Sequence, residues 1–149
     1  MRRWLFWLGL MMGLTGCALS GSGKGSGANV HAALSARLEE IRAAQSTALE
    51  LWDRVIAGET VSCQETIPVP TAVTLSERER SAYPPGVAVA EALNEAIGAI
   101  RNAADLWAIE CAEVRPVVPL DMARAGRNAA LAATAPLDRA TILLAAGTP

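Results

Sequence analysis

The sequence predicts an all-α protein, a small three- to four-helix bundle that a disulfide fastens and an irregular, proline-rich segment crosses. Two long stretches place apolar residues at alternating steps of four and three, the repeat of a helix that buries one face. Alanine, the strongest helix former, is abundant, and aromatic residues are few. The stretch 31–149 is long enough for one domain with a buried core, so we expect a single helical bundle there.

The first long helix is expected from about Asn29 or Val30 to Ala57. Its apolar seam is Leu34, Leu38, Ile41, Gln45, Ala48, Trp52 and Val55. Gln45 is the polar exception, and a polar seam residue can specify the register of helix packing. Gly58 follows the last apolar residues and suits the left-handed position that ends many helices.

The second long helix is expected from about Val87 to Val114, after an irregular stretch over residues 59–86 that four prolines exclude from one long helix. Within that stretch, Ser76 and Glu79 form a capping-box pattern, which predicts a helix of one or two turns before Tyr83. The seam of the second long helix is Val89, Leu93, Ala96, Ile100, Ala103, Trp107, Glu110 and Val114.

The C-terminal part, residues 119–146, is expected to form a third helix and then a fourth. Pro119 or Asp121 would open the third helix, and Pro136 would break or kink the run before it resumes at Leu137. A shift of 55 residues places Leu51-Trp52 on Leu106-Trp107. An old duplication or two similar heptads would both produce that match, and the abundance of alanine favours coincidence.

The N-terminus has the shape of an export signal. Arg2 and Arg3 precede an apolar run from Trp4 to Leu14, which as a helix would span about 16 Å, too short for a bilayer core of about 30 Å. A positive start before a short apolar run is typical of a signal peptide rather than of a transmembrane helix. An ordinary secretory signal and a twin-arginine signal are the alternatives, although the latter usually has polar residues before the arginine pair.

The order Leu14-Thr15-Gly16-Cys17 resembles the cleavage site of bacterial lipoproteins. The resemblance implies that a signal peptide, residues 1–16, is removed and that Cys17 carries a diacylglycerol, often with a further acyl chain such as palmitate. Two or more chains make a stable anchor, so the membrane would be the first partner of this protein. Residues 17–30, rich in glycine and serine, would then be the anchor and a flexible tether outside the cytoplasm. Ala18 favours the outer membrane if the cell has two.

Cys63 and Cys111 are the cysteines that remain, and an exported chain usually pairs them, although two buried thiols in an anaerobe are the alternative. Each follows or ends a long helix. If those helices were antiparallel, Cys63 would have to travel most of a helix length to reach Cys111. The connection between the helices is far longer than the 2–8 residues typical of antiparallel neighbours. The disulfide therefore predicts that the two long helices run parallel, with Trp52 and Trp107 in one layer beneath it.

Composition and motifs point away from most kinds of chemistry. No basic run exists that would bind nucleic acid, and residues 17–149 carry 11 basic against 15 acidic residues. His31 is the only histidine, and Cys-x-x-Cys spacing is absent, so we expect no metal and no cofactor. Nucleophilic catalysis lacks its usual base for the same reason. The sequence thus predicts a protein that is not an enzyme.

Trp52, Trp107 and Glu110 are the candidate binding residues, since all three lie on the seams near helix ends. The simpler interpretation of both tryptophans is core packing. Glu110 could pair with Arg115, Arg124 or Arg127, or reach solvent. We expect an interaction or structural module of the cell envelope with a protein partner there. A small-molecule or peptide binder with a pocket in the bundle, or an accessory such as a hydrolase lid, is the alternative.

Overall fold

The computed structural model describes residues 24–112 and 117–147 of the 149-residue chain, so Cys17, the predicted signal peptide and Val114 lie outside the described part. All regular structure in that part is helical. The helices are α1 (Lys24–Ile56), α2 (Glu77–Ala82), α3 (Gly86–Ala112), α4 (Leu120–Leu131) and α5 (Thr134–Ala146). The predicted all-α, disulfide-stapled bundle is confirmed.

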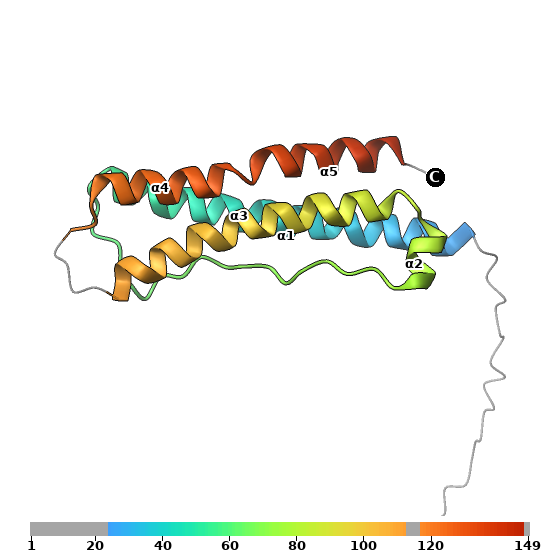
Figure 1. The fold of residues 1–149 in the computed structure, drawn as a ribbon, viewed down its shortest axis with the longest axis horizontal. Helices are drawn as coiled ribbons and strands as arrows, with labels where there is room; N and C mark the ends of the chain where they lie inside the picture. The colour runs from blue at the N-terminus through green and yellow to red at the C-terminus, as the bar shows by residue number, and fades with distance from the viewer. Residues whose placement is uncertain (1–23, 113–116, 148–149) are drawn as a thin grey trace, which may run out of the picture.

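The helices α1 and α3 run parallel, and α4 and α5 follow one another along them in the opposite direction (Figure 1). Contacts at both ends of the helices agree with this direction. Near the C-terminal ends, the rings of Trp52 and Trp107 have their centroids 5.6 Å apart. At the other end, a Cβ on Gly86, the first residue of α3, would lie 3.2 Å from Leu34 of α1. The predicted parallel arrangement is confirmed.

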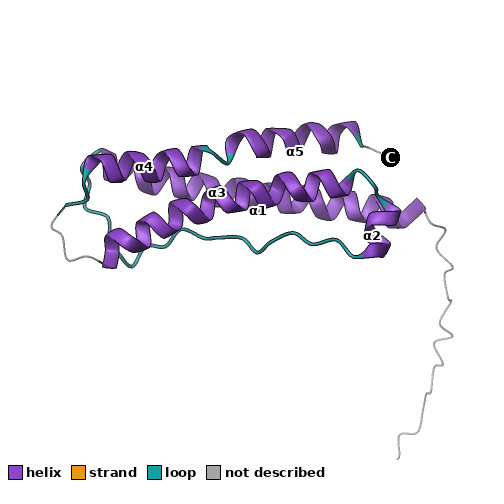
Figure 2. Ribbon diagram, in the orientation of Figure 1, coloured by secondary structure: helices purple, strands orange, loops and turns teal. Residues whose placement is uncertain are grey.

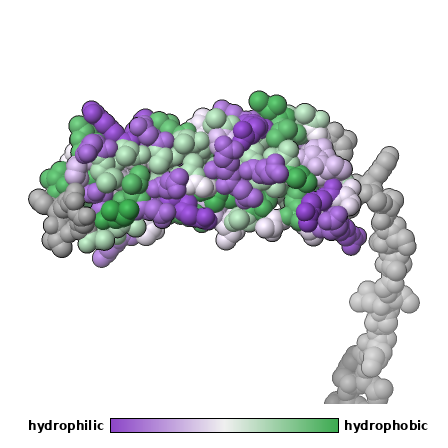
Figure 3. Space-filling view, viewed as in Figure 1, coloured by the Kyte–Doolittle hydropathy of each residue, from purple (hydrophilic) through white to green (hydrophobic). Residues whose placement is uncertain are grey.

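The core lies between the predicted seams. The seam residues of α3 from Val89 to Glu110 are all buried. Of the predicted seam residues of α1, Gln45 and Val55 are half-buried and the others are buried. The rod made by α4 and α5 contributes mainly small side chains, which allow close helix packing: Ala123, Gly126, Ala130, Ala133 and Ala140. On the face seen in Figure 3, hydrophilic and hydrophobic residues are mixed along the whole bundle.

The helix α1 begins at Lys24, earlier than expected, so the residues 24–30 of the predicted flexible tether are helical. Tertiary contacts explain this difference. Val30 is buried in the core. Gly27 lies against the end of α2, where a Cβ would come within 2.8 Å of the Ala82 carbonyl oxygen. The packing of this first part of α1 thus overrides the low helix propensity of glycine.

The break between α4 and α5 lies at Ala132 and Ala133 rather than at Pro136. Pro136 is in the first turn of α5, where its missing N–H would have no partner within the helix. Gln45 of α1 faces this break. Its Nε2 donates hydrogen bonds to the Ala130 carbonyl, 3.1 Å away, and to the Thr134 hydroxyl, 2.9 Å away. The polar seam residue therefore satisfies a carbonyl at the end of α4.

The crossover, residues 57–76, runs back along the outside of α1 and α3 to α2 without regular structure (Figure 2). Every third residue from Ile67 to Val73 is buried, which matches the three-residue repeat of an extended polyproline-type chain. Such a chain forms no internal hydrogen bonds, so helix side chains bind its backbone. Asn94 accepts from the Val73 N–H at 2.7 Å and donates to the Val73 carbonyl at 2.9 Å.

The small helix α2 follows the crossover and confirms the predicted capping box. The Ser76 hydroxyl accepts from the Glu79 N–H, and the Glu79 carboxylate accepts from the Ser76 N–H. These bonds satisfy backbone groups that a helix start leaves open. The helix ends at Ala82, before Tyr83, as expected.

Candidate functional site

The disulfide marks the end of the bundle where α1 and α3 both finish, which we call the disulfide end. Cys63 lies in the crossover shortly after α1, and Cys111 lies in the last turn of α3. Their Cα atoms are 5.4 Å apart, inside the 4.4–6.8 Å range of bridged cysteines. The bond holds the start of the crossover against α3. The predicted pairing is confirmed.

The two predicted tryptophans lie together beneath the disulfide but in different surroundings. Their rings meet edge to face, with an angle of 88° between the ring planes. Trp52 is completely buried, and its ring covers Gly126 of α4, where a Cβ would come within 2.2 Å of the indole. Trp107 donates from Nε1 to the Glu65 carbonyl of the crossover at 2.8 Å. Trp52 is therefore a core residue, whereas Trp107 fastens the crossover.

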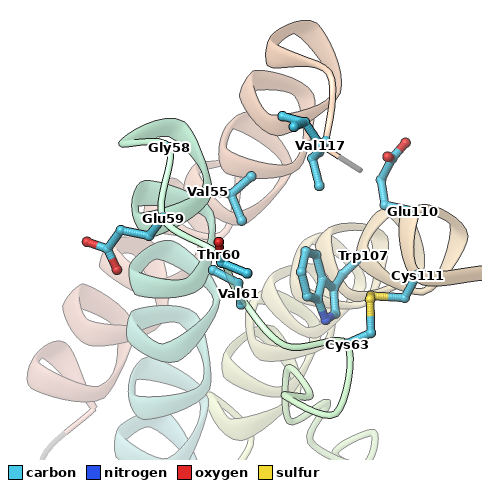
Figure 4. A pocket seen from close by; sticks show the side chains of 11 residues that line it. Val55, Gly58, Glu59, Thr60, Val61, Cys63, Trp107, Glu110, Cys111 and Val117 are labelled. Carbon is cyan, nitrogen blue, oxygen red and sulfur yellow. A yellow bond between two sulfur atoms is a disulfide. The ribbon is translucent and has the colours of Figure 1, made fainter. Parts of the chain in front are cut away.

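A pocket of about 170 Å³ opens beside Trp107 at the disulfide end. Most of its wall is apolar. Its residues are Val55, Gly58, Glu59, Thr60, Val61, Cys63, Trp107, Glu110, Cys111, Val117 and Val118. Figure 4 shows Val55, Thr60 and Val61 on one side and Trp107, Glu110 and Cys111 on the other. Of the three predicted binding residues, the structure brings Trp107 and Glu110 into one pocket and leaves Trp52 out of its lining.

Glu110 is the one charged residue that the structure buries among the described residues, with 6% of its surface exposed. Its Oε2 makes no hydrogen bond with any described residue. The expected arginine partners do not explain this. Arg127 donates to Asp53 at 2.5 Å instead, Arg124 is exposed, and Arg115 lies outside the described part.

The other carboxylates near the pocket have a cation. Arg54 bridges Glu59, at 3.1 Å, and Glu65, at 2.7 Å. The hydrogen bonds that Arg54 donates to Glu65 and then to Glu59 raise the pKa of Arg54, and the bond from Arg54 lowers the pKa of the Glu65 carboxyl. Glu59 and Glu65 thus each have a cation beside them. Glu110 differs from them because no described cation touches it.

Half of the pocket wall was not predicted from the sequence. Glu59, Thr60 and Val61 come from the crossover, and Val117 and Val118 precede α4. These segments have no helical periodicity that would mark a buried side. The expected bond from Cys63 to Cys111 was the one signal that could have placed Val61 beside α3.

Two further features bear on function. Among the described residues, no group of three or more histidine, cysteine or acidic side chains could hold a metal ion. The rod Leu120–Ala146 is long and apolar enough to cross a membrane by length and composition, but core helices of water-soluble proteins pass the same test. That finding is weak by itself.

Comparison with known proteins adds no relative. No family model matches the chain, and no curated protein and no solved structure is significantly similar to it. The function is therefore argued from the chain itself and from the site at the disulfide end.

Proposed function

We propose that this protein is a lipid-anchored, extracytoplasmic interaction module of the cell envelope that presents its disulfide end to a partner protein. The direction of α1 carries this proposal. The helix has 33 residues, about 50 Å at 1.5 Å per residue, and leads from the predicted anchor to the disulfide end. The chain from Cys17 to Lys24 reaches at most about 25 Å, so the anchor stays near the α2 end of the bundle.

The surface at the disulfide end supports a partner there. Three large hydrophobic side chains are exposed in this region: Ile109, Val117 and Leu120, with Val117 exposed by 75%. Ile109 comes from the last turns of α3, Val117 precedes α4, and Leu120 begins it; Figure 1 places the end of α3 and the start of α4 at the same end. Apolar residues beside a pocket are typical of protein contact sites.

The compartment and the position of the single histidine agree with the same proposal. A disulfide persists in oxidising compartments outside the cytoplasm. His31, the only histidine, lies at the α2 end, where its Nε2 is 3.2 Å from the Leu144 carbonyl. It is therefore far from the pocket and has a structural contact. A small-molecule site in the pocket at the disulfide end is less favoured, because about 170 Å³ is below the 300–1,000 Å³ typical of such sites.

Membrane fractionation of the full chain and of its Cys17→Ala variant tests the anchor. We expect the wild type in the membrane fraction, released by detergent but not by salt, and the variant in the soluble extracytoplasmic fraction. Mass spectrometry should find a diacylated Cys17 at the mature N-terminus. A variant that stays in the membrane, or an N-terminus at another residue, would contradict the anchor.

Photo-crosslinking in cells tests which end meets the partner. A crosslinking amino acid at Val117 probes the disulfide end, and the same group at exposed Glu77 of α2 is the matched control. We expect a discrete adduct from position 117 and a weaker or different pattern from position 77. Adducts from position 77 alone would place the partner at the α2 end and overturn this part of the proposal.

A further inference from the structure

We propose that the pocket at the disulfide end is a socket for one arginine side chain of the partner, with Glu110 as its carboxylate receptor. This inference rests on the proposed function, which supplies the partner, but the experiment that tests it does not depend on the lipid anchor. It names the chemistry that the partner presents. The observation behind it is a buried carboxylate oxygen with no described hydrogen-bond partner, in a pocket that opens to the surface.

A buried carboxylate without a partner is unfavourable, because it has lost water without gaining a hydrogen bond or a cation. Glu110 lines the pocket, and in Figure 4 its carboxylate points to the side from which Val117 approaches. A cationic group in the pocket would supply what the carboxylate lacks. A neutral donor would supply a hydrogen bond without the opposite charge, and an anionic acceptor would supply neither.

The electrostatic potential at the disulfide end also favours a cation. The described lining contains two carboxylates and no arginine, lysine or histidine. Both α1 and α3 end here, and the C-terminus of a helix carries partial negative charge. The last turn of α3 has no basic residue to offset it, whereas α1 has Arg54 there. The start of α4 gives only one positive helix end against these two negative ones.

The size and shape of the pocket favour a single side chain as its ligand, and its aromatic wall favours arginine. A volume of about 170 Å³ is too small for a typical small-molecule site but suits one long side chain. Trp107 and four valines would cover its aliphatic part, as apolar surfaces do for such stems. A planar guanidinium binds a carboxylate in two places and stacks on an indole, which an ammonium does less well. Arginine is also among the residues that most often dominate interfaces.

Calorimetric titration of the full chain in detergent tests the socket with three probes that need no known partner. These are the N-acetyl methylamides of arginine, of citrulline and of lysine. Citrulline has almost the shape of arginine but no charge. Loss of a charged hydrogen bond reduces affinity by roughly ten- to one-hundred-fold, so we expect arginine to bind at least about tenfold more tightly than citrulline. Lysine should bind between the two.

Two matched variants assign the effect to one carboxylate. Glu110→Gln should abolish the preference for arginine over citrulline, whereas Glu59→Gln, on the same pocket but already paired with Arg54, should retain it. Thermal unfolding checks that Glu110→Gln folds; the wild-type comparison of arginine with citrulline tests the proposal even if it does not. No preference in the wild type, or a preference that survives in Glu110→Gln, would overturn the socket. Lysine binding as tightly as arginine would overturn the choice of arginine.

Failure here is distinguishable from failure of the anchor. The titration uses purified protein and does not depend on membrane attachment, whereas fractionation of Cys17→Ala does not depend on the pocket. A protein that binds arginine but is not lipidated would keep the socket and lose the anchor. A lipidated protein without the preference would keep the anchor and lose the socket.

Discussion

The two ends of the bundle are closed in different ways. At the disulfide end, a covalent bond and two tryptophans hold the chain together but leave a pocket with a buried, unpartnered carboxylate. At the α2 end, His31 meets Tyr83 edge to face, with ring centroids 5.7 Å apart, and Gly27 allows α1 to approach the backbone of Ala82. Close backbone approach thus closes the α2 end, where the buried Tyr83 hydroxyl also has no hydrogen-bond partner among the described residues, whereas a covalent bond fixes the disulfide end.

Removal of the disulfide should have the largest effect. In the double variant Cys63→Ser and Cys111→Ser, the unfolded chain regains the freedom that a bond over a separation of 48 residues removes, about 4 kcal/mol in the chain-entropy model. We expect the melting temperature to fall by roughly 10–15 °C. Calorimetry of the wild type with reductant should give a similar value, and an unchanged melting temperature would show that packing alone holds this end.

The contact between Trp52 and α4 should be the next most sensitive. In Gly126→Ala, the new Cβ would overlap the indole, so we expect a loss of roughly 1–3 kcal/mol. Gly98→Ala is the matched control, because apart from its chain neighbours and the nearby backbone of its own helix nothing in the described structure lies within 4 Å of that Cβ position. The control should gain about 0.5–1 kcal/mol from helix propensity. Denaturant unfolding measures both, and equal effects would argue against the tight contact.

The corresponding glycine at the α2 end should matter less. Gly27→Ala would place a Cβ 2.8 Å from the Ala82 carbonyl oxygen, and the first turn of α1 or α2 must shift to relieve it. We expect a loss of roughly 1 kcal/mol, because these are terminal helix turns that adjust more easily than the core. Hydrogen exchange should show the loss of protection confined to the α2 end. A gain in stability, as expected for Gly98→Ala, would mean that α1 is not fixed there.

The smallest expected effect is a local acid sensitivity of α2. Hydrogen bonds from the Ser76 hydroxyl and backbone N–H lower the pKa of the Glu79 carboxyl below its usual 4.5. The folded state therefore favours the charged form, and this contribution is present above that usual value and lost as pH falls through the lowered one.

Hydrogen exchange of α2 between about pH 5 and 3 would measure this loss. Glu79→Gln should flatten the dependence, whereas Glu77→Gln, which lies outside the capping box, should keep it. The same acid dependence in both variants would assign the effect to another group. The disulfide end should respond in the same direction, because Arg54 lowers the pKa of the Glu65 carboxyl there.

The sequence by itself determined the helices, the capping box at Ser76, the pairing of Cys63 with Cys111 and, through that pairing, the parallel direction of α1 and α3. Periodicity and caps depend on residues a few positions apart. A bond between two cysteines that each follow or end a long helix constrains how those helices can run. These features could therefore be worked out without coordinates.

Only the tertiary structure decided where α1 begins, where α4 gives way to α5 and which residues form the pocket. Each depends on a contact between segments that are far apart in the sequence. Gly27 lies against the Ala82 carbonyl, Gln45 donates to the Ala130 carbonyl, and Trp107 donates to the backbone of the crossover. The local sequence does not predict such contacts. By itself a glycine indicates the end of a helix and a glutamine indicates a polar interruption of the apolar seam, and only the neighbouring backbone explains why each residue lies there. The same reason hid the unpartnered oxygen of Glu110, whose surroundings are set by three separate segments of chain.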